Sequence, residues 1–301
     1  MMGYEPRFFD PKNDVAFKRV FGQEDHKDVL IDFLNAVFED RHQAPIQSVE
    51  ILNPYQIPPH QQAKASIVDV LCKDSQGNIY IVEMQVPRQP DFLKRAQFYA
   101  SNEYVTQLEK GFDYGELRPV ILLSIVNHIL FPGNDKCISD HATLDINTKD
   151  HHLKDIQYTF IELPKFKKTL EEVTTIKDQW IYFFKNAHTD MDIPESVRGT
   201  QIYTAYESLE RFRWNAKQRR DYFEVNLAMM DENVRTRHAV NKGREEGREE
   251  GREEGQKKGR HEEKLETARR FYTLGLSDEM IIQGTGISMQ DLLEIKKNIE
   301  K

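Results

Sequence analysis

Two acidic residues stand in apolar surroundings in the stretch SIVDVLCKDSQGNIYIVEMQV, residues 66–86. The stretch predicts two strands joined by a turn at KDSQGN, and each strand carries one acid, Asp69 or Glu83. Successive side chains of a strand alternate between the two faces of a sheet, so a turn centred on Gln76 places Asp69 directly across from Glu83. Like charges in directly opposed positions are destabilising, and this arrangement therefore requires compensation.

Three kinds of compensation are open. One carboxylate could be protonated, which would make an acid dyad. A Lys or Arg side chain could pair with the acids, or a divalent cation could lie between them, since carboxylate oxygens are preferred ligands of Mg²⁺. Gln85 points to the same face as Glu83 and could hydrogen-bond a water or a phosphate oxygen beside such a cation.

The pattern of Asp69 followed by Glu-x-Gln on the next strand favours metal-assisted phosphodiester hydrolysis. The alternative is that both acids lie at a solvated strand end. The flank IYIVEMQV is apolar on both faces, which argues against that alternative.

The elements that would position these acids alternate between helix and strand. Asp10 and Pro11 predict a helix N-terminus, because Asp is a common N-cap and Pro fits the first helical position. Apolar patterns then predict helices at 28–38 and 91–108 and strands at 46–52, 118–130 and 156–163. We therefore expect one α/β domain over residues 1–165.

Only helical patterns follow this domain. We expect a helical appendage over residues 166–240, a Gly/Arg/Glu repeat spacer helix over 241–264 and a small helical hairpin over 265–301. In the repeat GREEGREEGREEGQKKGR, each glycine costs a helix about 1 kcal/mol relative to alanine. Ion pairs between Glu and Arg offset only part of that cost, which predicts a marginal and highly solvated helix.

The C-terminal hairpin resembles a helix-turn-helix, with Ser277 and Ser288 as the expected N-caps of its two short helices. Its last helix carries no cluster of basic residues on one face. A self-packed hairpin is therefore favoured over a DNA-binding one.

Composition sets broad limits on the class of protein. The 301 residues carry a net charge of -8, which gives no global attraction to nucleic acid but leaves room for a local basic surface. The chain contains no apolar run long enough to cross a membrane, and MMGYEPRFFDPKND lacks the order of a signal peptide, so we expect a cytoplasmic protein. Cys72 and Cys137 stand outside any CxxC pattern and are expected to be core thiols.

The spacing of Asp69 and the triplet Glu83-Met84-Gln85 resembles the PD-(D/E)XK nuclease signature. The variant with Gln in place of the usual Lys is typical of the Rpn-like recombination-promoting nucleases, also described as transposases. DPKNDVAFKRVFG resembles the N-terminal helix of that family, RAQFYASNEYVTQL its helix after the active strand, and the GREEG repeat its tail. The resemblance thus covers most of the chain.

This resemblance implies an α/β fold with a restriction-endonuclease-like core: a helix, a mixed sheet of about four to five strands, and a helix. An all-helical C-terminal region with a long charged helix would follow. Asp69 and Glu83, with the backbone carbonyl of Met84, would bind Mg²⁺, for which Mn²⁺ would substitute. Asp14 on the first helix would add a carboxylate to the catalytic group of Asp69, Glu83 and Gln85.

Gln85 departs from the usual family pattern, because an amide orients a water but cannot supply the positive charge of an ammonium. A cation from another element could compensate, and Lys18 is one candidate, a turn after Asp14. The alternative is that Asp14 and Lys18 form a plain surface ion pair. Arg88, Lys94 and Arg95 near the following helix could contact the phosphate backbone of DNA, or could lie on a solvated helix face.

The function favoured by these observations is a metal-dependent DNA endonuclease of low sequence specificity. A role in recombination or transposition is implied only by the resemblance. The alternative is a catalytically degenerate nuclease fold that serves as an interaction scaffold, and a helix-turn-helix DNA binder is a third hypothesis. We expect DNA as partner, with no membrane and no small-molecule cofactor, and a homodimer would make double-strand cutting easier.

Overall fold

The computed structural model describes residues 6–41, 44–56, 66–108 and 113–299. The chain divides into two compact units, residues 1–231 and residues 232–301. The first unit contains the sheet and the second is helical. Helix α6 (Ala216–Thr273) begins in the first unit and continues into the second.

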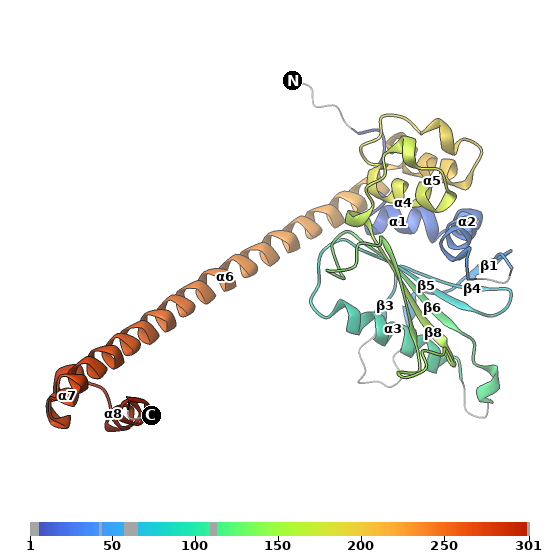
Figure 1. The fold of residues 1–301 in the computed structure, drawn as a ribbon. Coiled ribbons are helices and arrows are strands. Elements are labelled where there is room, and N and C mark those ends of the chain that lie inside the picture. Colours follow the sequence, from blue (N-terminus) through green and yellow to red (C-terminus); the bar gives the residue numbers. More distant parts are fainter. Residues whose placement is uncertain (1–5, 42–43, 57–65, 109–112, 300–301) are drawn as a thin grey trace, which may run out of the picture. The chain divides into compact units, whose positions relative to one another are not determined.

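The first unit is built on a six-stranded mixed sheet (Figure 1). The order of strands across the sheet is β1, β4, β5, β6, β8, β7. β5 pairs in parallel with β6, and β6 with β8, whereas the other pairs are antiparallel. The strand bounds are Val49–Ile51 for β1, Val70–Asp74 for β4, Ile79–Gln85 for β5, Val120–Val126 for β6, Ile138–Thr143 for β7 and Leu153–Glu162 for β8.

The β4–β5 hairpin has the register expected from its turn. Val70 pairs with Val82 and Leu71 with Ile81, so the hairpin is centred on Gln76. The turn is closed by the Asp74 carboxylate, whose Oδ1 accepts hydrogen bonds from the backbone N–H groups of Gln76 and Asn78. Gly77 follows with a φ of 88°, a conformation that glycine adopts without strain.

Helices cover both faces of this sheet (Figure 1). One face packs against α3 (Phe92–Thr106) through residues such as Leu71, Ile81 and Leu122. The other face packs against a helical layer made of α1 (Asp14–Phe21), α2 (Lys27–Phe38), α4 (Ile176–Asn186) and α5 (Gln201–Leu209). Every residue of β6 is buried, which confirms the central position expected from its apolar sequence.

The expected α/β core is present, with three local differences. The sheet has six strands, because β7 pairs with β8 at the edge. The sequence ISDHAT of β7 is polar and mostly exposed, so it lacks the apolar pattern that would predict a strand. A separate ribbon of β2 (Tyr55–Gln56) and β3 (Ser66–Ile67) takes the first residues of the segment that we expected to form one continuous strand.

The third difference concerns the first helix. Its N-cap is Asn13, whose side chain accepts hydrogen bonds from the backbone N–H groups of Val15 and Ala16. The expected N-cap, Asp10, instead accepts a hydrogen bond from the backbone N–H of Lys12 in the turn before the helix. The prediction from Asp10 and Pro11 was therefore wrong by one turn, because Asn13 offers an equally good cap.

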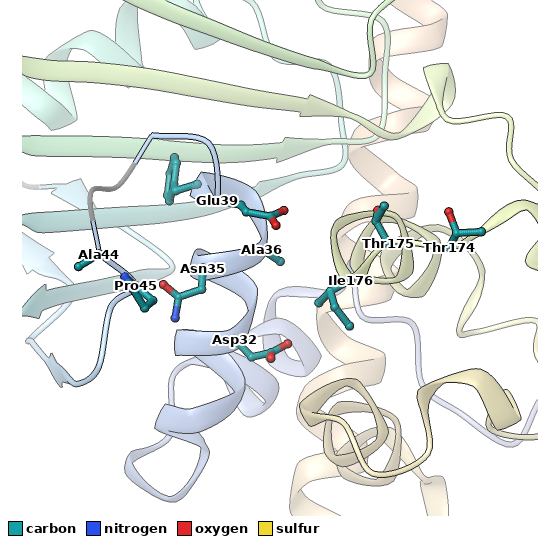
Figure 2. A pocket seen from close by; sticks show the side chains of 10 residues that line it. Asp32, Asn35, Ala36, Glu39, Ala44, Pro45, Thr174, Thr175 and Ile176 are labelled. Atoms are coloured by element: carbon teal, nitrogen blue, oxygen red, sulfur yellow. The ribbon is translucent and has the colours of Figure 1, made fainter.

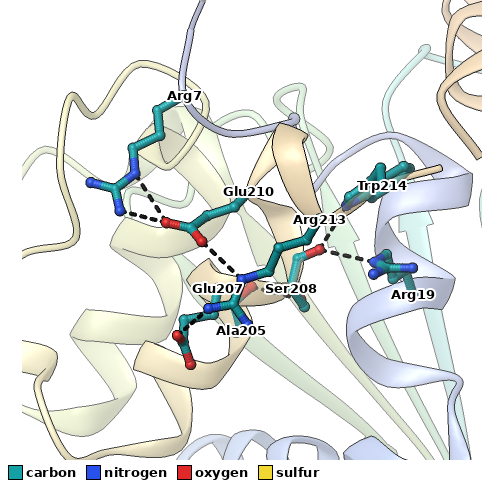
Figure 3. Close-up of polar contacts among 8 residues, drawn as sticks. All are labelled: Arg7, Arg19, Ala205, Glu207, Ser208, Glu210, Arg213 and Trp214. Carbon is teal, nitrogen blue, oxygen red and sulfur yellow. Dashed lines mark hydrogen bonds and ion pairs between the residues drawn. The ribbon is translucent and has the colours of Figure 1, made fainter. Parts of the chain in front are cut away.

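Polar contacts at Ser208 and Glu210 join α1, and the segment before it, to the end of α5 (Figure 3). Arg19 Nε and Trp214 Nε1 both donate to the backbone carbonyl of Ser208, at 2.9 and 2.8 Å. The nearly buried carboxylate of Glu210 accepts from Arg7 and Arg213. The Arg19 bond joins α1 to α5 and so helps to position the side chains that α1 presents to the sheet.

The second unit ends in two short helices, α7 (Asp278–Thr285) and α8 (Met289–Ile299), that pack on the last turns of α6. Ser277 caps α7 and Ser288 accepts a hydrogen bond from the backbone N–H of Asp291, as expected. The small core between these helices consists of the buried residues Ala268, Ile281, Ile287, Leu292 and Ile295. No helix in the described part of the chain is long and apolar enough to cross a membrane.

Short 3-10 turns link the larger elements: Glu24–His26, Tyr114–Glu116, Leu163–Lys165, Leu170–Glu172, Glu195–Val197 and Arg211–Arg213.

Candidate active site

The two acids of the hairpin lie directly opposite each other, as the hairpin register requires. Their carboxylates bind backbone groups reciprocally: the Asp69 N–H donates to Glu83 Oε1 at 3.1 Å, and the Met84 N–H donates to Asp69 Oδ2 at 2.8 Å. Glu83 is only 5% exposed and lies inside β5, whereas Asp69 lies in a bend just before β4. One oxygen of each carboxylate is thus held by the backbone of the other strand.

Burial and mutual repulsion oppose ionisation of this pair. Burial is the main cause that raises the pKa of Asp69 to about 7, and the neighbouring Asp14 carboxyl raises it further. Burial also raises the pKa of Glu83 well above its usual value, followed by the charge of Asp69. The site therefore concentrates negative charge that only a nearby cation or a proton can neutralise.

Helix α1 brings a third acid and a cation to the pair. Lys18 Nζ lies 2.7 Å from Asp14 Oδ1 and 3.6 Å from Asp69 Oδ1. Burial lowers the pKa of Lys18, but Asp14, Asp69 and Glu83 together outweigh burial and raise it. The ion pair between Asp14 and Lys18 is therefore present, and it is part of the carboxylate cluster rather than isolated on the surface.

Gln85 is buried beside this cluster, with 6% of its surface exposed. Its side-chain Nε2 donates to the backbone carbonyl of Pro87 at 2.8 Å. That bond fixes the orientation of the amide and leaves its oxygen as the group that can accept another hydrogen bond.

The three basic residues expected near the next helix do not lie together. Arg95 lines the same pocket as Asp69 and Glu83. Lys94 is exposed and forms an ion pair with Asp91 at 3.0 Å, and Arg88 is also exposed outside the residues that line this pocket. Only Arg95 of the three therefore belongs to the site itself.

The pocket around the acids has a volume of about 210 Å³ and includes residues that the sequence did not predict. Lys12 precedes α1, and Val225 and Met229 come from α6. These two apolar side chains line part of the pocket. Their sequence pattern is that of an ordinary amphipathic helix, so no sequence signal separates them from core residues.

Ser124 is a further unpredicted neighbour of the pair. It lies beside Glu83 in the parallel register of β5 and β6, is fully buried, and its Oγ has no hydrogen-bond partner among the described residues. A weak signal was available, because Ser124 is the single polar residue in the strand VILLSIV.

The donor set fits a divalent cation that prefers oxygen ligands. Asp69 Oδ1 and Glu83 Oε2 are not used by the backbone N–H groups that bind the other two oxygens. In the described ranges, no three His, Cys, Asp or Glu side chains are grouped so as to hold a metal ion by themselves. Two carboxylates, a backbone carbonyl and solvent would therefore have to make up the ligands, which is a common arrangement for Mg²⁺.

A larger pocket, of about 640 Å³, lies between α2 and the start of α4 (Figure 2). Its polar groups serve the fold. Asn35 exchanges two hydrogen bonds with the backbone of Ile46, Asp32 accepts from Trp180 Nε1 at 2.8 Å, and Thr175 caps α4. It has no counterpart to the opposed carboxylates of the hairpin.

A mixed sheet covered by helices on both faces, with two opposed carboxylates at the end of a hairpin, is the PD-(D/E)XK type of nuclease fold. The model of the family described as PD-(D/E)XK nuclease family transposase matches residues 11–239, and the chain belongs to this family. No curated protein and no solved structure matches the chain. Membership confirms the resemblance inferred from the motifs, indicates a nuclease-like role and implies DNA as the substrate.

Proposed function

We propose that the chain is a metal-dependent DNA endonuclease of low sequence specificity, with Asp69 and Glu83 as the metal ligands. The observation that carries this proposal is the reciprocal placement of the two carboxylates across the hairpin, each with one oxygen left for a cation. PD-(D/E)XK nucleases generally use divalent metal ions, and Mg²⁺ is the ion that this donor set suits, with Mn²⁺ as a substitute.

The residues of the site would have separate roles in metal binding and in the orientation of water. Asp69, Glu83 and the backbone carbonyl of Met84 would hold the ion, which when bound would neutralise phosphate charge and lower the pKa of water. Lys18, itself paired with Asp14, holds the Asp69 carboxylate in position through its second ion pair. Gln85, fixed by the Pro87 carbonyl, presents its amide oxygen to orient a water.

Low specificity is supported by the kind of groups proposed to contact DNA. Lys18, Arg88, Lys94 and Arg95 are cations suited to phosphates, which position a duplex without reading its bases. A role in recombination or transposition is supported by the description of the family. Strand transfer would require a second DNA end at the site, for which a homodimer is the simplest source.

Cleavage of supercoiled plasmid tests the proposal. Wild type is incubated with Mg²⁺, Mn²⁺ or Ca²⁺ beside Asp69→Asn and Glu83→Gln, which keep the shape of each side chain and remove its charge. We expect nicking with Mg²⁺ and Mn²⁺, and a loss of at least about 100-fold in either variant, since each removes a ligand. Undiminished nicking by the variants would show that the acids are not catalytic.

The alternative function is a non-catalytic scaffold, and Gln85 is the observation that favours it. The position that carries a Lys in most of the superfamily holds an amide whose nitrogen is already bonded to Pro87. Purified wild type that neither binds Mg²⁺ in calorimetry nor cuts single-stranded, linear or supercoiled DNA would establish the scaffold instead.

A further inference from the structure

Arg95 occupies the first turns of α3 and its guanidinium is held in a fixed orientation. Its Nε and Nη2 both donate to the hydroxyl of Tyr99, at 3.1 and 2.9 Å, and its Nη1 donates to Gln89 Oε1. The guanidinium carbon also lies 5.5 Å from the centroid of the Tyr99 ring. Tyr99 is itself buried in the core beside α3, with 8% of its surface exposed. We call these contacts of Arg95 with Tyr99 and Gln89 the clamp.

The clamp leaves part of the guanidinium available. An arginine carries five N–H donors, and the three hydrogen bonds to Tyr99 and Gln89 use three of them, so two remain. Arg95, Gln89 and the two acids all line one pocket. The two unused N–H groups, one on each terminal nitrogen, can donate to the oxygens of a phosphodiester.

The guanidinium of Arg95 is not paired with a carboxylate of the described residues. Both clamp partners are neutral, and no carboxylate of the described residues forms an ion pair with Arg95. The other cations differ in this respect: Lys18 is paired with Asp14 and Asp69, and Lys94 is paired with Asp91. Arg95 is nevertheless close enough to Glu83 that its charge opposes the rise in the Glu83 pKa that burial and Asp69 cause.

We propose that Arg95, oriented by Tyr99 and Gln89, binds the phosphodiester in the pocket and supplies there the positive charge that the Glu-x-Gln motif lacks. The inference rests on the proposed function for its substrate class. It assigns different tasks to the two cations nearest the acids. Lys18 neutralises and positions Asp69, whereas Arg95 contacts the phosphate and is the catalytic cation.

Binding of a small phosphodiester tests this assignment without requiring cleavage. The dinucleotide thymidylyl-thymidine carries a single phosphodiester, so contacts of longer DNA with distant cations do not mask the effect. Its affinity is measured by NMR titration in the presence of Ca²⁺ for wild type, Arg95→Ala, Arg95→Lys and Tyr99→Phe. Lys73→Ala is the matched control, because Lys73 is a cation on the same hairpin that pairs with Glu50 outside the pocket.

We expect Arg95→Ala to weaken dinucleotide binding about 10- to 100-fold, the usual effect of losing a charge-assisted contact. Arg95→Lys keeps the charge but loses the planar guanidinium, and Tyr99→Phe keeps the ring but loses the hydroxyl that accepts from Arg95. The dinucleotide affinity of both variants should therefore lie between that of Arg95→Ala and that of wild type. Equal affinity of Arg95→Ala, Lys73→Ala and wild type would overturn the inference.

Single-turnover cleavage separates this inference from the proposed function. Arg95→Ala should cut at least about 100-fold more slowly, and added guanidinium ion should restore part of the rate. If wild type cuts and Arg95→Ala matches its rate, the catalytic role of Arg95 is wrong and the nuclease proposal stands. If wild type does not cut but the dinucleotide result holds, the pocket binds phosphodiesters and the nuclease proposal fails.

Discussion

Asp69 and Glu83 face each other across the β4–β5 hairpin, and each carboxylate accepts a hydrogen bond from the backbone of the strand that carries the other. The fold therefore holds the two carboxylates close together, where their negative charges repel each other. Their high pKa values show that this arrangement costs stability in the absence of a cation. Such a cost is typical of a site built for a ligand rather than for the fold.

Asp69→Asn should stabilise the folded protein at alkaline pH. The pKa of Asp69 is raised to about 7, so the folded state binds a proton more tightly than the unfolded state and loses stability as pH rises from about 4 to about 7. The upper bound on this loss is about 4 kcal/mol, and Asn still accepts the bond from the Met84 N–H. Thermal unfolding should therefore show a higher Tm for the variant at pH 8 and no gain at pH 4.

Mg²⁺ should raise the Tm of the wild type, because a ligand that binds only the folded state stabilises it. A free concentration 100 times the Kd contributes about 2.7 kcal/mol. The control is Glu83→Gln, in which the shift should disappear. A shift of equal size in this variant would mean that the ion binds elsewhere.

Affinity for Mg²⁺ should rise with pH up to about the pKa of Asp69. Below pH 7 the proton on Asp69 competes with the ion, so affinity should fall as the solution is made more acidic. Calorimetric titrations between pH 5.5 and 8.5 measure this directly, and Asp69→Asn is expected to bind weakly at every pH. A Mg²⁺ affinity of wild type that does not change with pH would show that Asp69 does not bind the ion.

A chain cut after residue 231 should fold, whereas one cut after residue 165 should not. Helix α4 supplies rings that pack on α1 and α2: Trp180 lies 5.6 Å from Phe21, and Phe184 lies 5.2 Å from Phe33, between centroids. Removal of α4 and α5 exposes the apolar side chains of α1 and α2 that pack against them. Near-UV circular dichroism and cooperative denaturant unfolding distinguish the two outcomes.

Replacing Gly247 and Gly251 by Ala should stabilise the repeat part of α6. Both glycines are helical and an added Cβ meets no atom within 4 Å. Each replacement is worth about 1 kcal/mol in helix propensity. Slower hydrogen exchange of the amides around the repeat would be the readout, and exchange as fast as in wild type would show that the glycines do not limit helix stability.

The hairpin, its register and the opposed acids could be predicted because each depends on local signals. Strand parity and the turn at Gln76 place Asp69 across from Glu83 without knowledge of the rest of the chain. The start of α1 was misplaced because Asp10 and Asn13 are both good caps, and only tertiary contacts decide between them. Asn13 also donates to the Tyr222 carbonyl, a partner more than 200 residues away.

The rest of the site depends on packing between distant segments. Met229 and Val225 reach the pocket only because the start of α6 lies against the segment before α1, where the Tyr222 hydroxyl accepts a bond from the Asp10 N–H. Arg95 could be predicted as a cation near the acids. Its separation from Lys94 and Arg88 could not, because it depends on the clamp formed by Tyr99 and Gln89.

The bend at Asp69 joins two sheets. Val68 donates its N–H to the Pro54 carbonyl beside the β2–β3 ribbon, whereas Val70 pairs with β5 in the main sheet. Glu83 lies inside β5 and pairs with Ser124 of β6, so its position depends on the main sheet and not on the ribbon. Mg²⁺ binds oxygen at about 2.0–2.1 Å and Ca²⁺ at about 2.3–2.6 Å. Changes in the ribbon would therefore tune ion selectivity while the central strand stays unaltered.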